Sequence, residues 1–380
     1  MIEHGGRFDE LNAPTRVASQ RRDTADSPRN PAPAVFPLPN GGTRPDSLPV
    51  TVRYIRLGDV PRLRRLDPLH ILDRPESTVQ GWRPLRGALA SATPGGRDRR
   101  PAFVVEAGDR LVGYARFQTT APDGRWTLVA LGAAMGVYDA EPVWEALLST
   151  AVRQAGLRGV RSLFARIPWG VGASPLMSRL GWQPYATETL FLAHDVRGAW
   201  RDAMRPRPMK VSDTWSVHQL YAAAVPTAVQ QAEAFTSRRW ESAARGAKGR
   251  SAGLLFEDGP HLVGFARVTT GPGGRALDVL VHPERREVAG RMLDGALAAL
   301  APGGGRIWAT LRGYQDELAS PLQDRGFQPV FEQELFVRYT TARVRQPAPE
   351  PAPFALDVRE RAARQVPSFL AGAPDDRTAP

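Results

Sequence analysis

Leu111-Val112-Gly113-Tyr114-Ala115-Arg116 is the stretch that decides the fold, because the chain contains it twice. It returns 151 residues later as Leu262-Val263-Gly264-Phe265-Ala266-Arg267. Other matches follow in the same order, and Gly181-Trp182-Gln183-Pro184 returns at an offset of 145 as Gly326-Phe327-Gln328-Pro329. Ordered matches whose offset drifts by small deletions indicate a duplicated domain. A period of about 150 residues is too long for a solenoid repeat.

The length of 380 residues also favours two domains over one. We predict a disordered N-terminal tail, because residues 1–48 show no apolar periodicity, and a C-terminal tail that begins with an extended Pro-rich spacer. Within the C-terminal tail, Phe354 to Leu370 is compatible with a short docking helix or with a loose segment. The predicted division is tail 1–48, first copy 49–196, second copy 197–343 and tail 344–380.

Each copy shows the same succession of predicted elements. Turn residues between β-rich apolar runs indicate a hairpin, which is followed by a strand, a long helix, a strand, a short helix and a closing strand. The first copy has strands at 102–107, 111–119, 127–131, 162–167 and 188–194, and its long helix at 142–155. The second has strands at 253–256, 262–269, 276–281, 306–311 and 332–339, and its long helix at 289–300. This order predicts an α+β fold, with a mixed sheet in which the long helix crosses over one parallel pair.

The chain is basic, yet it carries no motif for a polyanion. Its net charge is +11, and of 50 basic residues only Lys210 and Lys248 are lysines. An arginine bias beside 35 prolines and 36 glycines is typical of GC-rich coding sequence, and the arginines are scattered over both copies. We therefore expect a solvated surface and no nucleic-acid partner. The opposing hypothesis, an Arg-rich nucleic-acid binder, predicts an affinity that falls steeply with salt.

The absence of cysteine excludes disulfides, thiolate zinc sites and a cysteine nucleophile. No apolar run approaches the roughly 20 residues that cross a bilayer, and the first residues lack the apolar stretch of a signal peptide. We therefore expect a cytoplasmic protein with no membrane partner.

The element order, with Leu-Val-Gly-Phe-Ala-Arg before the central strand and Arg-Gly-Phe-Gln-Pro before the last one, resembles the GNAT superfamily of acyl-coenzyme A-dependent N-acyltransferases. The resemblance covers both copies, and the tandem arrangement of the chain is similar to that of members such as mycothiol synthase. In this family a strand leads into a loop whose backbone N–H groups, at the start of the long helix, hold the coenzyme's pyrophosphate. By this resemblance, the coenzyme-binding residues of the second copy are Leu280, Val281, His282, Arg285, Arg286, Glu287, Val288, Ala289, Gly290 and Arg291.

The two copies depart from the family's loop to different degrees. In the second, Val288 stands where the first loop glycine is expected, and Arg286 and Arg291 are available to pair with phosphate oxygens. In the first, the loop carries no arginine and holds Asp139 and Glu141, which repel a polyanion. We therefore predict a degenerate first copy and a second copy that binds acyl-coenzyme A.

The resemblance implies that an amine attacks a thioester, assisted by a general base and by a proton donor to the leaving thiolate. Asp278, in the predicted strand 276–281, is the candidate base. The family's tyrosine position holds Leu322, and Tyr314 in the preceding loop is the candidate donor. His261 and His282 are the only histidines nearby, so no metal site is expected.

The leading hypothesis is therefore transfer of an acyl group, from acetyl-CoA or another acyl-CoA, to a small amine or a peptide by the second copy. The alternative is a catalytically inactive tandem GNAT fold that binds a ligand or a partner. The duplication further predicts that the two copies pack as an intramolecular pseudo-dimer.

Overall fold

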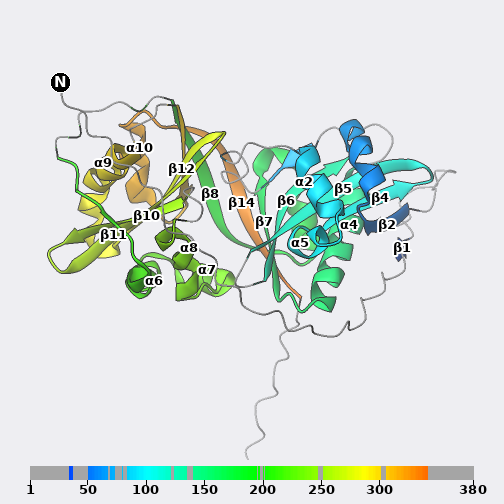
Figure 1. The fold of residues 1–380 in the computed structure, drawn as a ribbon, viewed down its shortest axis with the longest axis horizontal. Helices are drawn as coiled ribbons and strands as arrows, with labels where there is room; N and C mark the ends of the chain where they lie inside the picture. Colours follow the sequence, from blue (N-terminus) through cyan, green and yellow to red (C-terminus); the bar gives the residue numbers. More distant parts are fainter. Residues whose placement is uncertain are drawn as a thin grey trace, which may run out of the picture.

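The computed structural model describes residues 34–36, 50–66, 69–72, 79, 84–120, 124–134, 140–194, 196, 200, 202–246, 251–300 and 305–340 (Figure 1). The tail helix considered at 354–370 and the first-copy loop residue Asp139 lie outside these residues. So does nearly all of the tail 1–48.

The elements of the first copy follow the predicted order. They are β2 (Val50–Tyr54), the 3₁₀-helix η1 (Leu57–Arg65), β3 (Leu69–Ile71), α2 (Pro84–Ala92), α3 (Gly96–Arg99), β4 (Ala102–Ala107), β5 (Arg110–Thr120), β6 (Arg125–Ala133), α4 (Ala140–Leu157), β7 (Ser162–Pro168), η2 (Trp169–Val171), α5 (Ser174–Arg179) and β8 (Gln183–His194). The strand β3 is an element that the sequence pattern did not indicate.

The second copy repeats this order. Its elements are β9 (Arg207–Pro208), η3 (Val211–Asp213), α6 (Thr214–Ala224), α7 (Thr227–Glu233), η4 (Ser237–Trp240), α8 (Glu241–Ala244), β10 (Ser251–Asp258), β11 (His261–Gly271), β12 (Gly274–Val281), η6 (Pro283–Val288), α9 (Ala289–Leu300), β13 (Arg306–Arg312), η7 (Asp316–Leu318), α10 (Ala319–Gln323) and β14 (Gln328–Tyr339).

The predicted mixed sheet is present in both copies. Strands β6 and β7 run parallel with α4 between them in sequence, and β12 and β13 run parallel with α9 between them. In the first copy, alternate residues of β4 face opposite sides: Phe103 and Val105 pack in the core beneath α4, whereas Val104 packs with α2. The second copy likewise has one core under α9 and another under α6, α7 and α8. Helices therefore bury both faces of the sheet.

The two copies exchange their closing strands, which the sequence pattern did not predict. Across the described residues, the sheet runs β1-β2-β4-β5-β6-β7-β14-β8-β13-β12-β11-β10-β9, with β3 paired to β6. The last strand of the second copy, β14, pairs with β7, and the last strand of the first copy, β8, pairs with β13. Figure 1 shows β8 and β14 as the long central strands that join the two copies. One sheet therefore passes through both copies without a break.

The register between β8 and β14 has two-fold character. Gln333 lies opposite Glu188, and these two residues occupy equivalent positions of the repeat at the offset of 145. Each copy's sheet is completed by a strand of the other, so side chains of β8 reach the interior of the second copy.

The strand β1 (Ala34–Phe36) corrects part of the predicted N-terminal tail. These three residues pair antiparallel with β2, with Val35 opposite Thr51. The physical reason is that β2 is otherwise an edge strand, whose unpaired backbone groups accept a further apolar segment.

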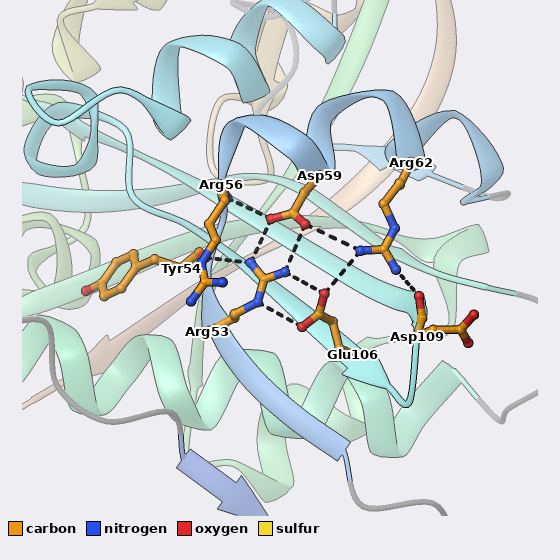
Figure 2. A network of polar contacts seen from close by, with 7 residues as sticks. All are labelled: Arg53, Tyr54, Arg56, Asp59, Arg62, Glu106 and Asp109. Carbon is orange, nitrogen blue, oxygen red and sulfur yellow. Dashed lines mark hydrogen bonds and ion pairs between the residues drawn. The ribbon is translucent and has the colours of Figure 1, made fainter.

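An arginine clamp at the start of each copy shows that the duplicated scaffold is retained (Figure 2). In the first copy, Arg53 donates hydrogen bonds of 2.7 and 2.9 Å to Asp59, and of 2.9 and 2.5 Å to Glu106. Its counterpart Arg207 pairs at 2.8 Å with Asp213 and at 2.7 Å with Glu257. Each arginine thereby joins the first strand, the following 3₁₀ turn and the hairpin.

The aspartate of each clamp also holds the turn that follows the first strand. Asp59 lies in the first turn of η1, where its Oδ2 accepts a 2.7 Å bond from the backbone N–H of Arg56. Asp213 accepts the equivalent bond from Lys210. Each carboxylate therefore binds both its arginine and the backbone three residues before it.

Candidate functional site

A cavity of about 620 Å³ lies where the two copies meet, and both copies supply its walls. The first copy contributes residues of β5, β6, β7 and β8, and the second contributes α6, α7, α8, β11, β12 and β13. Figure 1 shows α7 next to the strands that join the copies. The charged residues of the lining are Arg125, Arg166, Glu188, Glu233, Arg239, Arg267, Asp278 and Arg312.

Both candidate catalytic residues line this cavity, and so does one of the ten candidate coenzyme residues. Asp278, Leu280 and Tyr314 belong to the wall, whereas Val281, the last residue of β12, and the candidate residues from His282 to Arg291 lie outside the described lining. Asp278 and Leu280 share a face because strand side chains alternate. The predicted base and the predicted proton donor thus line the same cavity.

The carboxylate of Asp278 is held in the cavity wall by two neighbours. Arg267, directly opposite on β11, donates to its Oδ2 at 3.0 and 2.6 Å, and the hydroxyl of Thr310 on β13 donates to its Oδ1 at 2.6 Å. Burial by itself raises the pKa of Asp278, but the charge of Arg267 and these hydrogen bonds outweigh it and lower the pKa below its usual value. Asp278 is therefore an ionised, oriented carboxylate at neutral pH.

The phenol of Tyr314 lies in the loop after β13 and is half-buried. Burial raises its pKa above the ordinary value, more than the nearby positive charge of Arg312 lowers it. A tyrosine with a raised pKa keeps its proton at neutral pH, which suits a proton donor rather than a base.

The parallel strands β12 and β13 separate beside Asp278. They pair only at Arg275 with Ile307, Ala276 with Trp308, and Leu277 with Ala309. Along its other edge β12 pairs with β11 as far as Val281. Residues 278–281 therefore have one edge without a strand partner among the described residues.

A single side chain bridges this separation. The Nε2 of Gln315 donates a 2.8 Å hydrogen bond to the carbonyl of Val279 on β12. Its Oε1 accepts a 3.0 Å bond from the backbone N–H of Arg312 at the end of β13. Gln315 thus occupies the gap between the strands, where sequence analysis assigned it no role.

A buried charge network, also missed by sequence analysis, forms another part of the wall. Arg312 donates to Glu188 at 2.7 Å and to Glu233 at 3.3 Å. Glu233 also accepts a 2.8 Å bond from the hydroxyl of Tyr221, and Glu188 accepts one of 2.5 Å from Gln333. Both carboxylates are buried, and their charge is balanced by Arg312, which contacts both, and by Arg166, which lies 3.5 Å from Glu188. Glu188 arrives on the exchanged strand β8, which is why its place in the second copy cannot be inferred from its sequence position.

A signal for this network is present in the repeat itself. Arg312 corresponds to Pro168, since Arg312 lies opposite Glu188 and Pro168 lies opposite Gln333. A charged residue at only one of two equivalent positions indicates which copy contains the site.

The predicted coenzyme loop forms the 3₁₀-helix η6 rather than an open turn. The side chain of His282 accepts a bond from the N–H of Glu284 at 3.3 Å, and its carbonyl accepts one from the N–H of Arg285 at 2.9 Å. The N–H of Ala289 bonds to the carbonyl of Arg286. Val288 and Ala289 are buried, so the apolar start of α9 faces the core.

The arginines around this loop have contacts of their own. Arg285 pairs with Asp258 and, at 2.7 Å, with Glu287. Arg291 pairs with Asp202 at 3.2 Å, and Arg286 is exposed. The carbonyl of Gly290 accepts a 2.9 Å bond from Arg325.

The corresponding strand separation in the first copy is filled by backbone. Strands β6 and β7 pair at three positions only, from Trp126 with Leu163 to Leu128 with Ala165. Beyond them β3 pairs with residues 130–132 of β6, and Leu72 donates its N–H to the carbonyl of Val129. Since β5 already pairs with the opposite edge of β6, β3 occupies the edge that faces β7.

Comparison with known proteins identifies the fold. No family model matches the chain, and no curated protein matches it. It is similar to the structure of a GCN5-related N-acetyltransferase from Sphaerobacter thermophilus, with a TM-score of 0.52, 14% identity, and coverage of 78% of this chain and 97% of that one. A tandem GNAT protein from the clavulanic acid biosynthesis pathway matches with a TM-score of 0.46 and 13% identity, over 78% of this chain and 100% of that one.

The protein thus has a tandem GNAT fold of the α+β class, as its sequence predicted. At this level of identity the similarity defines the fold and leaves the activity to be argued from the site.

Two further searches of the described residues gave negative results. They contain no group of three or more His, Cys, Asp or Glu residues arranged to hold a metal ion. None of the helices in the same residues is long and apolar enough to cross a membrane.

Proposed function

We propose that the protein is an acyl-CoA-dependent N-acyltransferase, with acetyl-CoA as acyl donor and a small amine or a peptide as acceptor. The observation that carries this proposal is the convergence of Asp278 and Tyr314 on one cavity, beside the point where β12 and β13 separate. A base, a proton donor and an unpaired strand edge are the groups that aminolysis of a thioester requires.

The residues of the second copy fit the acyl donor in part. The free edge of β12 at residues 278–281 supplies backbone groups for an extended chain, and the arginines at the start of α9 supply charge for phosphates. Binding requires that the side chain of Gln315 leave the carbonyl of Val279, and that Arg285 and Arg291 exchange carboxylate partners for phosphate. Those ion pairs lie at the surface, where water screens them, so such an exchange costs little.

In the proposed reaction, Asp278 accepts a proton from the acceptor's ammonium group, directly or through one water molecule. The neutral amine nitrogen then attacks the thioester carbonyl carbon, and a C–N bond forms as the C–S bond breaks. Tyr314 gives its proton to the leaving sulfur, the second proton of the attacking nitrogen returns to the phenolate of Tyr314, and Asp278 releases its proton to solvent. Arg267 and Thr310 keep the carboxylate of Asp278 oriented toward the cavity throughout.

We further propose a division of labour between the copies. The second copy (197–343) holds the coenzyme, and the first (49–196) acts as its intramolecular pseudo-dimer partner, which supplies Glu188 and part of the cavity wall. The backbone of β3 in the first copy's strand separation supports this asymmetry. Because the acyl donor is a cytoplasmic metabolite, we place the protein in the cytoplasm.

A second candidate function is ligand binding without catalysis. It is favoured by the internal hydrogen bonds of η6 and by the bridge that Gln315 makes across the strand gap. Under this hypothesis the tandem fold is a binding or regulatory protein whose cavity holds a ligand and transfers nothing.

Titration calorimetry with acetyl-CoA, together with an assay of thiol release over a panel of amines, separates the two functions. We expect micromolar binding that is lost in Gly290→Glu, because a carboxylate at the start of α9 repels phosphate. Gly58→Glu, which adds the same charge where nothing lies within 4 Å, is the control. Binding without thiol release supports the ligand-binding protein, and no binding of acetyl-CoA overturns the transferase.

A further inference from the structure

The proposed base of the cavity, Asp278, is a weak base. Its carboxylate accepts hydrogen bonds of 3.0 and 2.6 Å from Arg267 and one of 2.6 Å from Thr310. Burial raises the pKa of Asp278, but the charge of Arg267 and these bonds outweigh burial, so the pKa lies below its ordinary value of about 3.9. An alkylammonium, such as that of lysine, has a pKa of about 10.4. Transfer of its proton to Asp278 is therefore unfavourable by a factor of about a million or more.

A weakly basic amine matches such a carboxylate better. When a nitrogen is bonded directly to an aromatic ring, its lone pair is delocalised into the ring, and the pKa of its ammonium form falls close to that of a carboxylic acid. Proton transfer from this ammonium to Asp278 is far less unfavourable, and at pH 7 most of the amine is neutral already. The basicity of the acceptor is thus one constraint that the site imposes.

The cavity lining is also rich in aromatic rings. Seven of its 29 residues are Phe, Tyr or Trp, about three times the 8% found in the whole chain. Four of them form one aromatic cluster, in which the ring centre of Tyr221 lies 5.5 Å from those of Phe235 and Trp240, and Trp240 lies 5.6 Å from Phe265. Tyr314, the proposed proton donor, packs against the same cluster. Such a wall suits a planar ring.

The strand register places this aromatic cluster beside Asp278. Phe265 and Arg267 are alternate residues of β11, and they lie opposite Leu280 and Asp278 of β12. Alternate residues of a strand face the same side and are about 7 Å apart. A ligand ring that packs on Phe265 therefore brings an atom bonded directly to the ring within reach of the Asp278 carboxylate.

We propose that the acceptor is an arylamine, a small molecule whose amino nitrogen is bonded directly to an aromatic ring. Its ring lies on the aromatic cluster, and its nitrogen lies at Asp278. This inference rests on the proposed function, and it narrows the acceptor from a small amine or a peptide to one chemical class. Strongly basic acceptors, such as alkylamines and lysine side chains, are disfavoured because Asp278 is too weak a base for their ammonium groups.

One acceptor position of the carboxylate is left for the amine. A carboxylate offers about four such positions, and the bonds from Arg267 and Thr310 use three of them at Asp278. An N–H of the arylamine donates to the fourth, which stabilises the positive charge that develops on the nitrogen during attack.

The reaction is balanced without a further reactant. The nitrogen of the neutral arylamine attacks the thioester carbonyl carbon, so that a C–N bond forms and the C–S bond breaks. Tyr314 gives its proton to the sulfur and receives one of the two nitrogen protons in return. The small fraction of arylamine that arrives as ammonium first loses its extra proton to Asp278. The products are an N-acyl arylamine and the free thiol of the coenzyme.

The test measures thiol release by the full chain, with saturating acetyl-CoA, for two isomeric amines. In 4-methylaniline the nitrogen is on the ring, and in benzylamine it is one carbon away. At pH 7 we expect kcat/KM for 4-methylaniline to exceed that for benzylamine by about 100-fold or more. The ratio should fall about tenfold for each unit that pH rises toward the benzylammonium pKa, because only neutral benzylamine reacts. A ratio near one at pH 7, or a ratio that does not change with pH, overturns the proposal.

Methoxyamine, a weakly basic amine without a ring, tests the aromatic cluster. We expect its KM to exceed that of 4-methylaniline by about tenfold or more. Phe235→Leu and Phe265→Leu should each raise KM for 4-methylaniline by about fivefold relative to methoxyamine, whose turnover also reports that the variants are folded. Phe331→Leu, at a half-buried position outside the lining, is the control. Equal KM values for the two amines, or no relative change in either cluster variant, overturn the proposal.

Failure of this proposal is distinguishable from failure of the transferase. If acetyl-CoA binds and thiol is released with benzylamine at least as fast as with 4-methylaniline, the transferase stands and the acceptor class is wrong. If acetyl-CoA does not bind, the transferase itself is wrong, and the arylamine proposal is wrong with it.

Discussion

The first and second copies keep the same scaffold and differ at the site. Both retain the arginine clamp, through Arg53 in one and Arg207 in the other. Counted from the first pair of each parallel ladder, however, Asp278 of the second copy corresponds to Val129 of the first. The strand gap in the first copy is closed by the backbone of β3, and that in the second by the side chain of Gln315.

This difference separates the features that both copies keep because folding requires them from the features that differ because only one copy forms the site. A strand seated in the gap forms several backbone hydrogen bonds and is displaced only by local unfolding. A glutamine side chain releases two hydrogen bonds by rotation. The strand gap of the first copy is therefore closed by backbone that belongs to the sheet, whereas the gap of the second copy is closed by a side chain that is able to rotate away.

The largest expected effect concerns the buried network that only the second copy contains. Arg312→Met leaves the buried Glu233 without its cation and Glu188 with only the 3.5 Å ion pair to Arg166, and should lower the free energy of unfolding by about 3–5 kcal/mol. Urea unfolding at pH 7 measures this. Pro168→Ala, at the equivalent position of the first copy, is the control and should change stability far less. Comparable losses in both variants contradict the asymmetry.

Asp278 gives the next largest effect. Asp278→Asn should lower the turnover number by about 100-fold or more, because the amide cannot accept the ammonium proton. Steady-state assays of thiol release measure the loss, and Asp316→Asn, at an exposed position outside the cavity, is the control. Turnover that is unchanged in Asp278→Asn removes this residue from the mechanism.

The pH dependence of stability tests the same carboxylate. Because the folded-state pKa of Asp278 lies below its unfolded value near 4, its ionised form stabilises the protein above that value. This contribution is lost as pH falls through the lower folded pKa. The stability difference between the parent protein and Asp278→Asn should therefore be constant near neutrality and shrink below about pH 4. A difference that grows on acidification contradicts the sign of the shift.

The arginine clamps should differ in strength according to burial. The side chain of Arg53 is 12% exposed and that of Arg207 is 39% exposed. Arg53→Met should cost about 2–4 kcal/mol of unfolding free energy, since the buried Asp59 is left with only the 3.6 Å ion pair to Arg62. Arg207→Met, more screened by water, should cost about 1 kcal/mol or less. Thermal unfolding of the two variants ranks them, and the reverse order contradicts the comparison.

The smallest expected effect concerns the bridge between β12 and β13. Gln315→Ala frees the carbonyl of Val279 and should tighten acetyl-CoA binding by about threefold, while two hydrogen bonds of about 1 kcal/mol each are lost from the free protein. Calorimetry measures the first effect and urea unfolding the second. Weaker binding of acetyl-CoA to Gln315→Ala indicates that this side chain contacts the bound coenzyme rather than occupying its site in the free protein.

Much of the local structure was predictable because it depends on local patterns. The helix expected at 289–300 is α9, and the strand expected at 102–107 is β4. The placement of Asp278 on the same face as Leu280 also followed from strand alternation. The short strand β3 was not predictable, since three residues carry too little periodicity to indicate a strand.

The site residues that belong to the second copy were predictable from the sequence, and those that the first copy contributes were not. Asp278 lies on β12 and Tyr314 in the loop after the neighbouring strand β13 of the same copy, and both line the cavity. Glu188 and Arg125 belong to the other copy, and no pattern within 49–196 indicates that they reach the second. The loop at 282–291 forms a 3₁₀-helix because Val288 is buried and His282 caps the turn, interactions that a motif comparison does not weigh.

The sequence by itself determined the duplication, the order of elements and the α+β class, because periodicity and turn chemistry act over a few residues. Only the tertiary structure decided that β8 and β14 change places, since strand pairing depends on complementary edges distant in sequence. That exchange brings Glu188 beside Arg312, and the junction it creates is where both copies enclose the cavity. The scaffold is thus set by local physics, and the site by the long-range pairing of two strands.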